Sequence, residues 1–126
     1  MSGKSVLIIG LDPNLIDFSQ PGYPPDMSAT KVMAGLKSSE DELTALGYSV
    51  HRCLTDFGET AEAVLESALR QKHFDCICIG AGVRAIPSNL ILFEKLINVA
   101  HQHAPQAKIC FNTMPGDTAA AVKRWI

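Results

Sequence analysis

Several polar and charged side chains directly follow apolar runs of the chain, and their types suit the binding of a small anion. Asp12 and Asp17 follow the first run, Arg84 follows the third, and Asn112 and Thr113 follow the last. An arginine guanidinium holds a carboxylate or phosphate through two parallel hydrogen bonds, and an aspartate can act as a general base. These residues predict a small-molecule or anion-binding site, or an enzyme acting on a small anionic substrate. The alternative for Arg84 is an internal ion pair with Asp12 or Asp17.

Two glycines precede Arg84 in the stretch GAGVRA, residues 80–85, which fits the pattern G-x-G-x-x-A. A dinucleotide-binding fingerprint needs such glycines to lead straight into a helix, with an acid about 20 residues further on at the end of the next strand. Residues 86–88 separate the glycines from the next expected helix, and the next apolar run ends without an acid. We therefore interpret the stretch as a tight turn, in which Gly80 and Gly82 let the backbone approach a ligand or take a positive φ. No cofactor is identified.

Cysteines and histidines offer weaker chemistry. The four cysteines lie within apolar runs, where a free thiol behaves as a small hydrophobic group, so we expect reduced core residues. No turn of the type C-x-x-C that is typical of structural zinc occurs, and no G-x-S-x-G nucleophile turn accompanies the histidines. These predictions concern Cys53, Cys76, Cys78 and Cys110, and His51, His73, His101 and His103.

Short runs that are apolar on both faces predict strands of a covered parallel sheet at residues 5–11, 76–79 and 109–111, and a more alternating run predicts a strand at 48–54. Amphipathic patterns between these runs predict helices at 28–46, 59–71 and 89–103, and a fourth after Asp117. Ser28 and Gly47 are the expected start and stop of the first helix. Asp56 is expected to form a capping box with Glu59, and Ser88 and Asp117 are expected to cap the last two helices.

Alternation of strands and helices predicts a three-layer α/β/α sandwich: a flavodoxin-like or Rossmann-like domain over residues 1–126, with four parallel strands in the order 2-1-3-4. Ligands of such sheets bind outside the carboxyl ends of the strands, where the strand order reverses. The candidate ligand-binding residues at that edge are Asp12, Asp17, Gly80, Gly82, Arg84, Asn112 and Thr113. Asn112 and Thr113 have the alternative of only hydrogen-bonding their own turn.

An unusually long connection, residues 12–27, joins the first strand to the first helix and contains four prolines and a glycine. Its apolar and aromatic residues indicate a folded lid over the site instead of a flexible segment. They are Leu15, Ile16, Phe18 and Tyr23.

Charge and hydropathy exclude several classes of partner. The net charge is −2, which gives no basic surplus for nucleic acid or an anionic membrane. No long apolar run and no secretory leader are recognised, so a cytoplasmic location is expected. An unpaired fourth strand and a helix at 89–103 that is apolar over more than half its circumference favour a homodimer. Alternatively, neighbouring helices of the same chain cover that helix.

The stretches VLIIGLDP, FDCICIGAGVRA, LILFEKLINVAHQHAP and QAKICFNT resemble successive pieces of a response-regulator receiver domain. Receivers carry a pair of acids after the first strand, where this chain has Gly10-Leu11 and keeps only Asp12, and a phosphate-accepting aspartate where Gly80 stands. Thr113 matches their hydroxyl residue, but their lysine after a fifth strand has no counterpart. The resemblance therefore implies a degenerate receiver-like fold that cannot be phosphorylated at that position, with protein interaction as its function.

Over nearly its whole length the chain is also similar to a group of small uncharacterised bacterial proteins with a flavodoxin-like fold. The segments that carry this resemblance are GAGVR, LFEKLIN, HAP and FNTMPGDTA, with a tryptophan near the end. It implies the fold and no activity.

Overall fold

Four parallel strands form a single sheet in the order β2-β1-β3-β4 in the computed structural model, which describes residues 3–126. They are β1 (Ser5–Leu11), β2 (Ser49–Thr55), β3 (Cys76–Ile79) and β4 (Lys108–Phe111). β1 pairs along its whole length with β2, from Ser5 opposite Ser49 to Leu11 opposite Thr55, and over a shorter stretch with β3. The predicted strand order and α/β class are confirmed, and the arrangement is flavodoxin-like.

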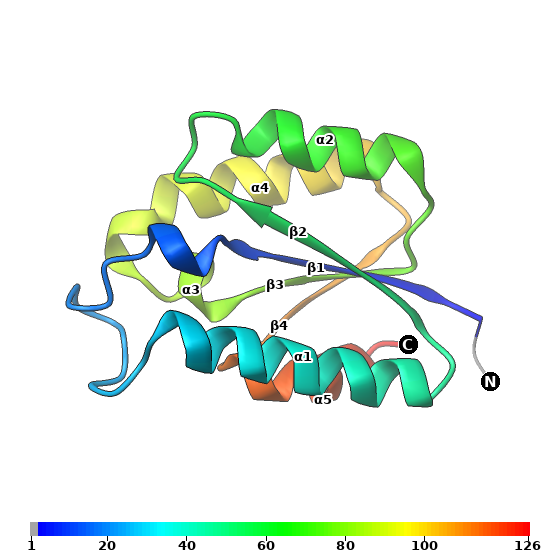
Figure 1. Ribbon diagram of the computed structural model, residues 1–126. Coiled ribbons are helices and arrows are strands. Elements are labelled where there is room, and N and C mark those ends of the chain that lie inside the picture. Colours follow the sequence, from blue (N-terminus) through cyan, green and yellow to red (C-terminus); the bar gives the residue numbers. More distant parts are fainter. Residues whose placement is uncertain (1–2) are drawn as a thin grey trace.

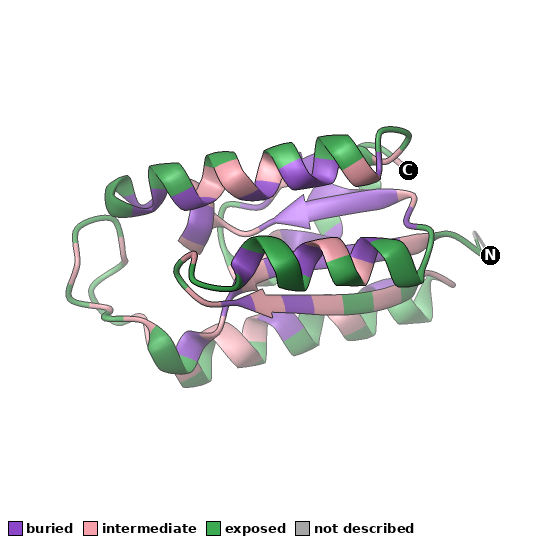
Figure 2. Ribbon diagram, turned by 90° about the horizontal axis from the view of Figure 1, so that it is seen from above, coloured by how far each residue is buried: buried purple, intermediate pink, exposed green. Residues whose placement is uncertain are grey.

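Helices cover both faces of the sheet (Figure 1). α1 (Ala29–Ala45) and α5 (Thr118–Lys123) lie on one face, and α2 (Ala61–Gln71) and α4 (Leu90–His103) on the other. Alternate side chains of each strand enter one of two cores: Leu7 and Ile9 of β1 pack under α2 and α4, whereas Val6 and Ile8 pack under α1 and α5. Figure 2 shows the burial of the strands and the exposed outer sides of the helices.

Residues 3–126 also contain four shorter helical segments, which lie in the loops. They are the 3-10 helices Pro13–Leu15, Pro87–Asn89 and Pro115–Asp117, and the one-turn α3 (Ala81–Arg84). Proline opens each 3-10 helix because its fixed φ suits the first helical position and its missing N–H is not needed there. α3 begins directly after Gly80, where we predicted a turn without a helix.

The ends of α1 are confirmed, whereas the predicted caps at Asp56 and Ser88 are wrong. Ser28 accepts a hydrogen bond from the Lys31 N–H at 3.2 Å, and Gly47 takes a φ of 96° just after the helix. Asp56 forms no capping box, because its carboxylate accepts from Thr60 and closes the loop before α2 instead.

Ser88 and Asp117 bond to other segments. The Ser88 hydroxyl donates to Gln20 at 2.8 Å, and Asn89 stands at the N-cap of α4. Asp117 stands at the N-cap position of α5, as predicted, but its carboxylate accepts from the N–H groups of Thr113 and Met114 at the start of the preceding 3-10 helix and makes no capping bond to α5.

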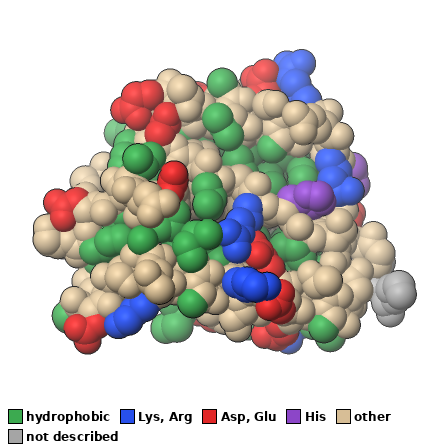
Figure 3. All heavy atoms as spheres, in the orientation of Figure 1, with side chains coloured by type: hydrophobic (Ala, Val, Ile, Leu, Met, Phe, Trp, Pro, Cys, Tyr) green, Lys and Arg blue, Asp and Glu red, His purple; other side chains and the backbone are tan. Residues whose placement is uncertain are grey.

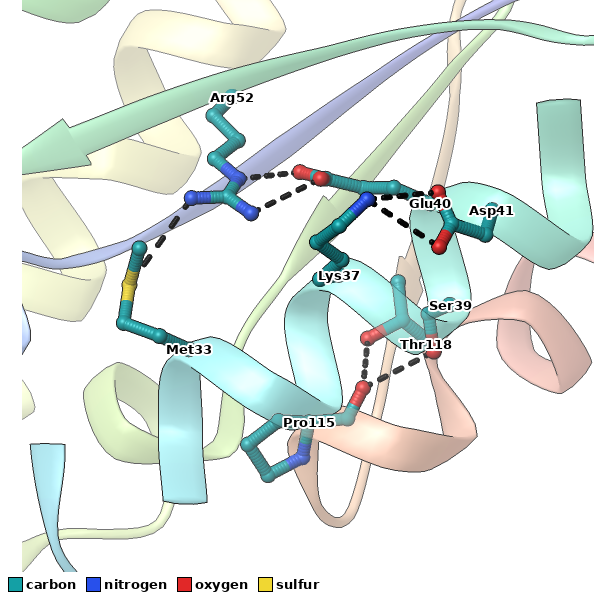
Figure 4. A network of polar contacts seen from close by, with 8 residues as sticks. All are labelled: Met33, Lys37, Ser39, Glu40, Asp41, Arg52, Pro115 and Thr118. Atoms are coloured by element: carbon teal, nitrogen blue, oxygen red, sulfur yellow. Dashed lines mark hydrogen bonds and ion pairs between the residues drawn. The ribbon is translucent and has the colours of Figure 1, made fainter. Parts of the chain in front are cut away.

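Two sets of polar contacts attach α1 to its neighbours (Figure 4). Glu40 of α1 forms an ion pair with Arg52 of β2, and Ser39 donates to the carbonyl of Pro115 at 3.0 Å. Thr118 donates to the same carbonyl at 2.9 Å. The segment after β4 is therefore held between α1 and α5, close to the carboxyl end of the sheet.

The outer face of α4 stays partly open. Leu90 and Ile91 are 56% and 60% exposed, whereas Leu92 and Leu96 are buried against the sheet. Neighbouring helices thus cover only part of the apolar circumference of α4.

β4 is an edge strand. Because Lys108 donates its N–H to Asp75 of the adjacent chain segment, alternation turns the backbone groups of Ile109 and Phe111 outward. Arg124 donates to the outward Phe111 carbonyl at 3.0 Å.

Acidic and basic side chains are intermixed on the face of the molecule shown in Figure 3, in keeping with the net charge of −2. Within residues 3–126, no helix combines the length and apolarity needed to cross a membrane.

Candidate functional site

A cavity of about 430 Å³ lies at the carboxyl ends of β1, β3 and β4. Its floor comes from residues 8–11 of β1 and from the start of α3, and one wall comes from Val32 and Leu36 of α1. Residues 112–115 after β4 form the opposite wall. This is the edge where the strand order reverses between β1 and β3, which is the position at which open α/β sheets bind ligands.

Residues 12–27, the lid loop, form the roof of this cavity through Ile16, Tyr23 and Met27 among others. Two contacts fold the loop: the rings of Phe18 and Tyr23 meet edge to face at 5.1 Å, and Gln20 accepts the hydrogen bond of Ser88. A glycine is required in this loop at residue 22. Its φ is +106°, and a Cβ there would stand 2.9 Å from the Ile86 side chain.

Apolar side chains dominate the cavity wall, and no Asp, Glu, Lys, Arg or His belongs to it. The polar side chains in the wall are those of Tyr23, Asn112 and Thr113. Both polar atoms of the Asn112 side chain have a partner within the protein: Oδ1 accepts from the Ala81 N–H at 2.7 Å, and Nδ2 donates to Thr118 at 2.9 Å. The Thr113 hydroxyl is likewise engaged, by the Asp117 carboxylate.

The hydroxyl of Tyr23 is the exception. Its Oη is buried and has no hydrogen-bond partner within residues 3–126. It lies 3.9 Å from the point where a Cβ on Gly82 would stand, so the two residues adjoin in the cavity wall. Burial raises the pKa of Tyr23, so the phenol is protonated at neutral pH and has a proton to donate.

Of the candidate residues from the sequence, Gly80, Gly82, Asn112 and Thr113 line the cavity. Of the two alternatives predicted for these glycines, the positive φ is wrong: Gly80 has a φ of −70°, and Gly82 is not among the positive-φ glycines. Gly82 instead leaves open the space in front of Tyr23.

Asp12 and Asp17 do not line the cavity. Each carboxylate organises its own turn: Asp12 accepts from the Asn14 N–H at 3.0 Å, and Asp17 accepts from the Ser19 hydroxyl at 2.6 Å and its N–H at 3.0 Å. These two bonds from Ser19 lower the pKa of Asp17.

Arg84 does not line the cavity either. It donates to the Asn112 carbonyl at 3.0 Å, and its guanidinium carbon lies 5.8 Å from the centre of the Phe111 ring. The predicted alternative of an ion pair with Asp12 or Asp17 is wrong, because no carboxylate of residues 3–126 lies within ion-pair distance of Arg84. The Nε of Arg84 is buried and has no partner in the described part of the chain.

The sequence did not predict that α1 forms part of the cavity wall, and Tyr23 was predicted as a lid residue but not as a ligand-binding residue. An aromatic residue with a polar tip in a proline-rich connection at the ligand-binding edge was the available signal. The α1 wall gave no such signal, because apolar residues on a helix face predict core packing before they predict a cavity.

A second hollow, of about 330 Å³, lies at the opposite edge of the sheet, between the carboxyl ends of α2 and α4. Its lining includes Arg70, Lys72, His73 and His103. Basic groups are favourable at helix C-termini, and Arg70 and His103 already contact Glu66. The helix ends thus account for these basic residues, and their partial negative charge opposes a bound anion.

The cysteines are core residues with free thiols, as predicted. Cys76 and Cys110 of neighbouring strands approach to 3.6 Å between sulfurs. Hydrogen bonding to Cys110 and burial raise the pKa values of Cys76 and Cys78, and burial raises the pKa of Cys53 to about 11. Within residues 3–126 no group of His, Cys, Asp or Glu side chains is arranged to hold a metal ion.

The geometry therefore offers one preformed apolar cavity at the ligand-binding edge of the sheet and no constellation that identifies a reaction in the described residues. No model of a known protein family matches the chain, and no curated protein matches it either.

Proposed function

We propose that this domain binds a small molecule in the cavity beneath the lid loop. The observation that carries the proposal is the cavity itself, whose volume of about 430 Å³ falls in the range of small-molecule sites. Its position, where the strand order reverses, and its roof of folded rather than extended chain support the same function.

The experiment that tests the proposal is a titration with N-phenyl-1-naphthylamine, a neutral dye that brightens in apolar surroundings, against the wild type and Gly82→Leu. The added side chain would enter the open space before Tyr23 without backbone strain, because φ at Gly82 is not positive. We expect saturable binding by the wild type and at least a tenfold loss of affinity in the variant.

Gly116→Leu is the matched control. It makes the same chemical change at a glycine that does not line the cavity and whose Cβ would meet nothing within 4 Å. Equal binding by Gly82→Leu and the wild type, or no saturable binding by the wild type, contradicts the proposal.

A catalytic role receives less support. The enzyme hypothesis uses Asp12 or Asp17 as a base and Arg84 to orient an anionic substrate, yet none of these side chains lines the cavity. We therefore do not extend the proposal to a reaction.

The second candidate is a receiver-like interaction module that forms a homodimer through α4. The favouring observation is the exposure of Leu90 and Ile91 on that helix, in line with the resemblance to receivers. A symmetric antiparallel pair through β4 is less favourable, because Lys108 of one copy would approach the end of β4 where Arg84 and Arg124 of the other copy lie.

Sedimentation velocity from 10 to 300 μM tests this candidate. A dimer that dissociates in Ile91→Lys supports it, since a buried lysine without a partner disrupts an apolar interface. A monomer across the whole concentration range excludes it and leaves the small-molecule proposal untouched.

A further inference from the structure

We propose that the ligand of this cavity is a neutral, mainly apolar molecule that carries one hydrogen-bond acceptor, and that the Tyr23 hydroxyl donates to that acceptor. This inference rests on the proposed function and names its ligand class. It replaces the anion expected from the sequence, because the charged residues behind that expectation lie elsewhere.

The cavity disfavours charged ligands. The cavity wall holds no basic side chain, and Arg84 is directed to the Asn112 carbonyl and the Phe111 ring. A carboxylate or phosphate entering this space would lose its hydration and gain no counter-charge, which is unfavourable in apolar surroundings. The same reasoning excludes a cation, since no acidic side chain lines the wall.

The polar side chains of the cavity wall differ in whether they have hydrogen-bond partners within the protein. Both hydrogen-bonding atoms of the Asn112 amide have protein partners, and the Thr113 hydroxyl bonds to Asp117. Tyr23 Oη alone among the polar side-chain groups of the wall is buried without a partner. Buried hydroxyls in folded proteins are almost always hydrogen-bonded, so this one calls for a bonding group on the ligand.

In that hydrogen bond Tyr23 is the donor and the ligand is the acceptor. A protonated phenol donates strongly, and burial raises the pKa of Tyr23, so the proton is retained. The complementary ligand group is therefore an acceptor such as a carbonyl, ether or ring nitrogen.

A matched set of probes tests the inference: 2-acetylnaphthalene, 2-ethylnaphthalene and 2-naphthoate, measured at pH 8 by equilibrium dialysis. They share one ring system and differ in bearing a neutral acceptor, no acceptor, or a charge. In the wild type we expect the ketone to bind about 3- to 10-fold more tightly than the hydrocarbon. We expect the carboxylate to bind at least about tenfold more weakly than the ketone.

Tyr23→Phe keeps the ring that packs on Phe18 and removes the hydroxyl. In this variant the ketone and the hydrocarbon should bind within about twofold of each other. Infrared spectroscopy gives a second readout: the C=O stretch of the bound ketone should be shifted to lower frequency in the wild type, and in the variant it should return to its value in apolar solvent. Tyr48→Phe, a change of the same kind at a tyrosine packed against the α1 and α5 core, should leave both readouts unchanged.

Each outcome decides a separate claim. Tightest binding of naphthoate overturns the ligand class while leaving small-molecule binding intact. An unchanged ratio of ketone to hydrocarbon in Tyr23→Phe overturns the role of the hydroxyl. Absence of binding by all three probes, together with absence of dye binding, overturns the proposed function itself.

Discussion

The side chain of Asn112 connects several segments around the cavity. It is 3% exposed and links three segments: it accepts from the first N–H of α3, donates to Thr118 of α5, and follows β4 in the chain. The same amide thus fixes two sides of the cavity. A phosphate at the start of α3 would have to compete with it, which is a further reason why the glycines of residues 80–85 do not act as a dinucleotide-binding turn.

Replacing Asn112 with alanine should destabilise the protein by about 1–3 kcal/mol, because the Ala81 N–H loses its acceptor and the buried Thr118 hydroxyl loses a donor. Urea unfolding followed by far-UV circular dichroism measures this loss. Asn98→Ala on the exposed side of α4 is the control, with an expected change within about 0.5 kcal/mol. Equal effects of the two substitutions would contradict the assigned role.

Arg84 and Tyr23 show why sequence alone could not place the site residues. The position of Arg84 after β3 put it at the correct edge of the sheet. Its side-chain direction depends on α3, a single turn that no periodicity reveals, and that turn directs the guanidinium to Phe111. The importance of Tyr23 depends on which partner its hydroxyl lacks, and a missing partner leaves no trace in sequence.

At the scale of elements, the close approach of α1 to the 3-10 helix Pro115–Asp117 determines the width of the cavity. Gly35 makes this approach possible: a Cβ there would stand 2.7 Å from the Cβ of Pro115 and 3.1 Å from the Gly116 nitrogen. Ser39 reinforces the contact through the Pro115 carbonyl (Figure 4).

Gly35→Ala should therefore destabilise the protein by about 1–3 kcal/mol, although alanine is favoured over glycine within helices by about 1 kcal/mol. The overlap with Pro115 and the backbone of Gly116 outweighs helix propensity. Thermal and urea unfolding give the sign directly. Gly116→Ala, with open space around its Cβ, should be neutral or slightly stabilising, and a stabilised Gly35→Ala would contradict this packing argument.

The strands and their order could be predicted from the sequence more reliably than the residues that cap the helices. Apolar runs identified the strands because both faces of a covered parallel sheet exclude water, and crossover rules then supplied the strand order. Asp56 and Ser88 failed as caps, and the Asp117 carboxylate makes no capping bond to α5, because each of these side chains has a competing partner in a loop. Local spacing rules contain no information about such partners.

At the scale of the whole molecule, several carboxylates couple folding to pH. Backbone hydrogen bonding from Ser5 lowers the pKa of Asp75 below its ordinary value of 3.8, and bonds from Thr60 lower that of Asp56 in the same way. A lowered folded-state pKa stabilises the native protein above the unfolded-state pKa, and this contribution is lost as the pH falls through the folded-state pKa.

The free energy of unfolding should accordingly fall with acidification below about pH 4.5. Asp75→Asn should show a shallower fall between pH 5 and 3, because the amide keeps an acceptor for Ser5 but does not titrate. Urea unfolding at pH 3, 4, 5 and 7 gives the slope for each protein. A slope in Asp75→Asn as steep as that of the wild type would show that this carboxylate does not contribute.

The exposed edge of β4 affects how copies of the protein associate at high concentration. One outward carbonyl is already taken by Arg124, and Lys108, Arg84 and Arg124 place positive charge at both ends of a strand only four residues long. If a misfolded copy paired its β4 with this edge, the paired stretch would be short and the positive charges of the two strands would repel each other. We therefore expect β4 to be a poor template for fibril growth when the protein is concentrated.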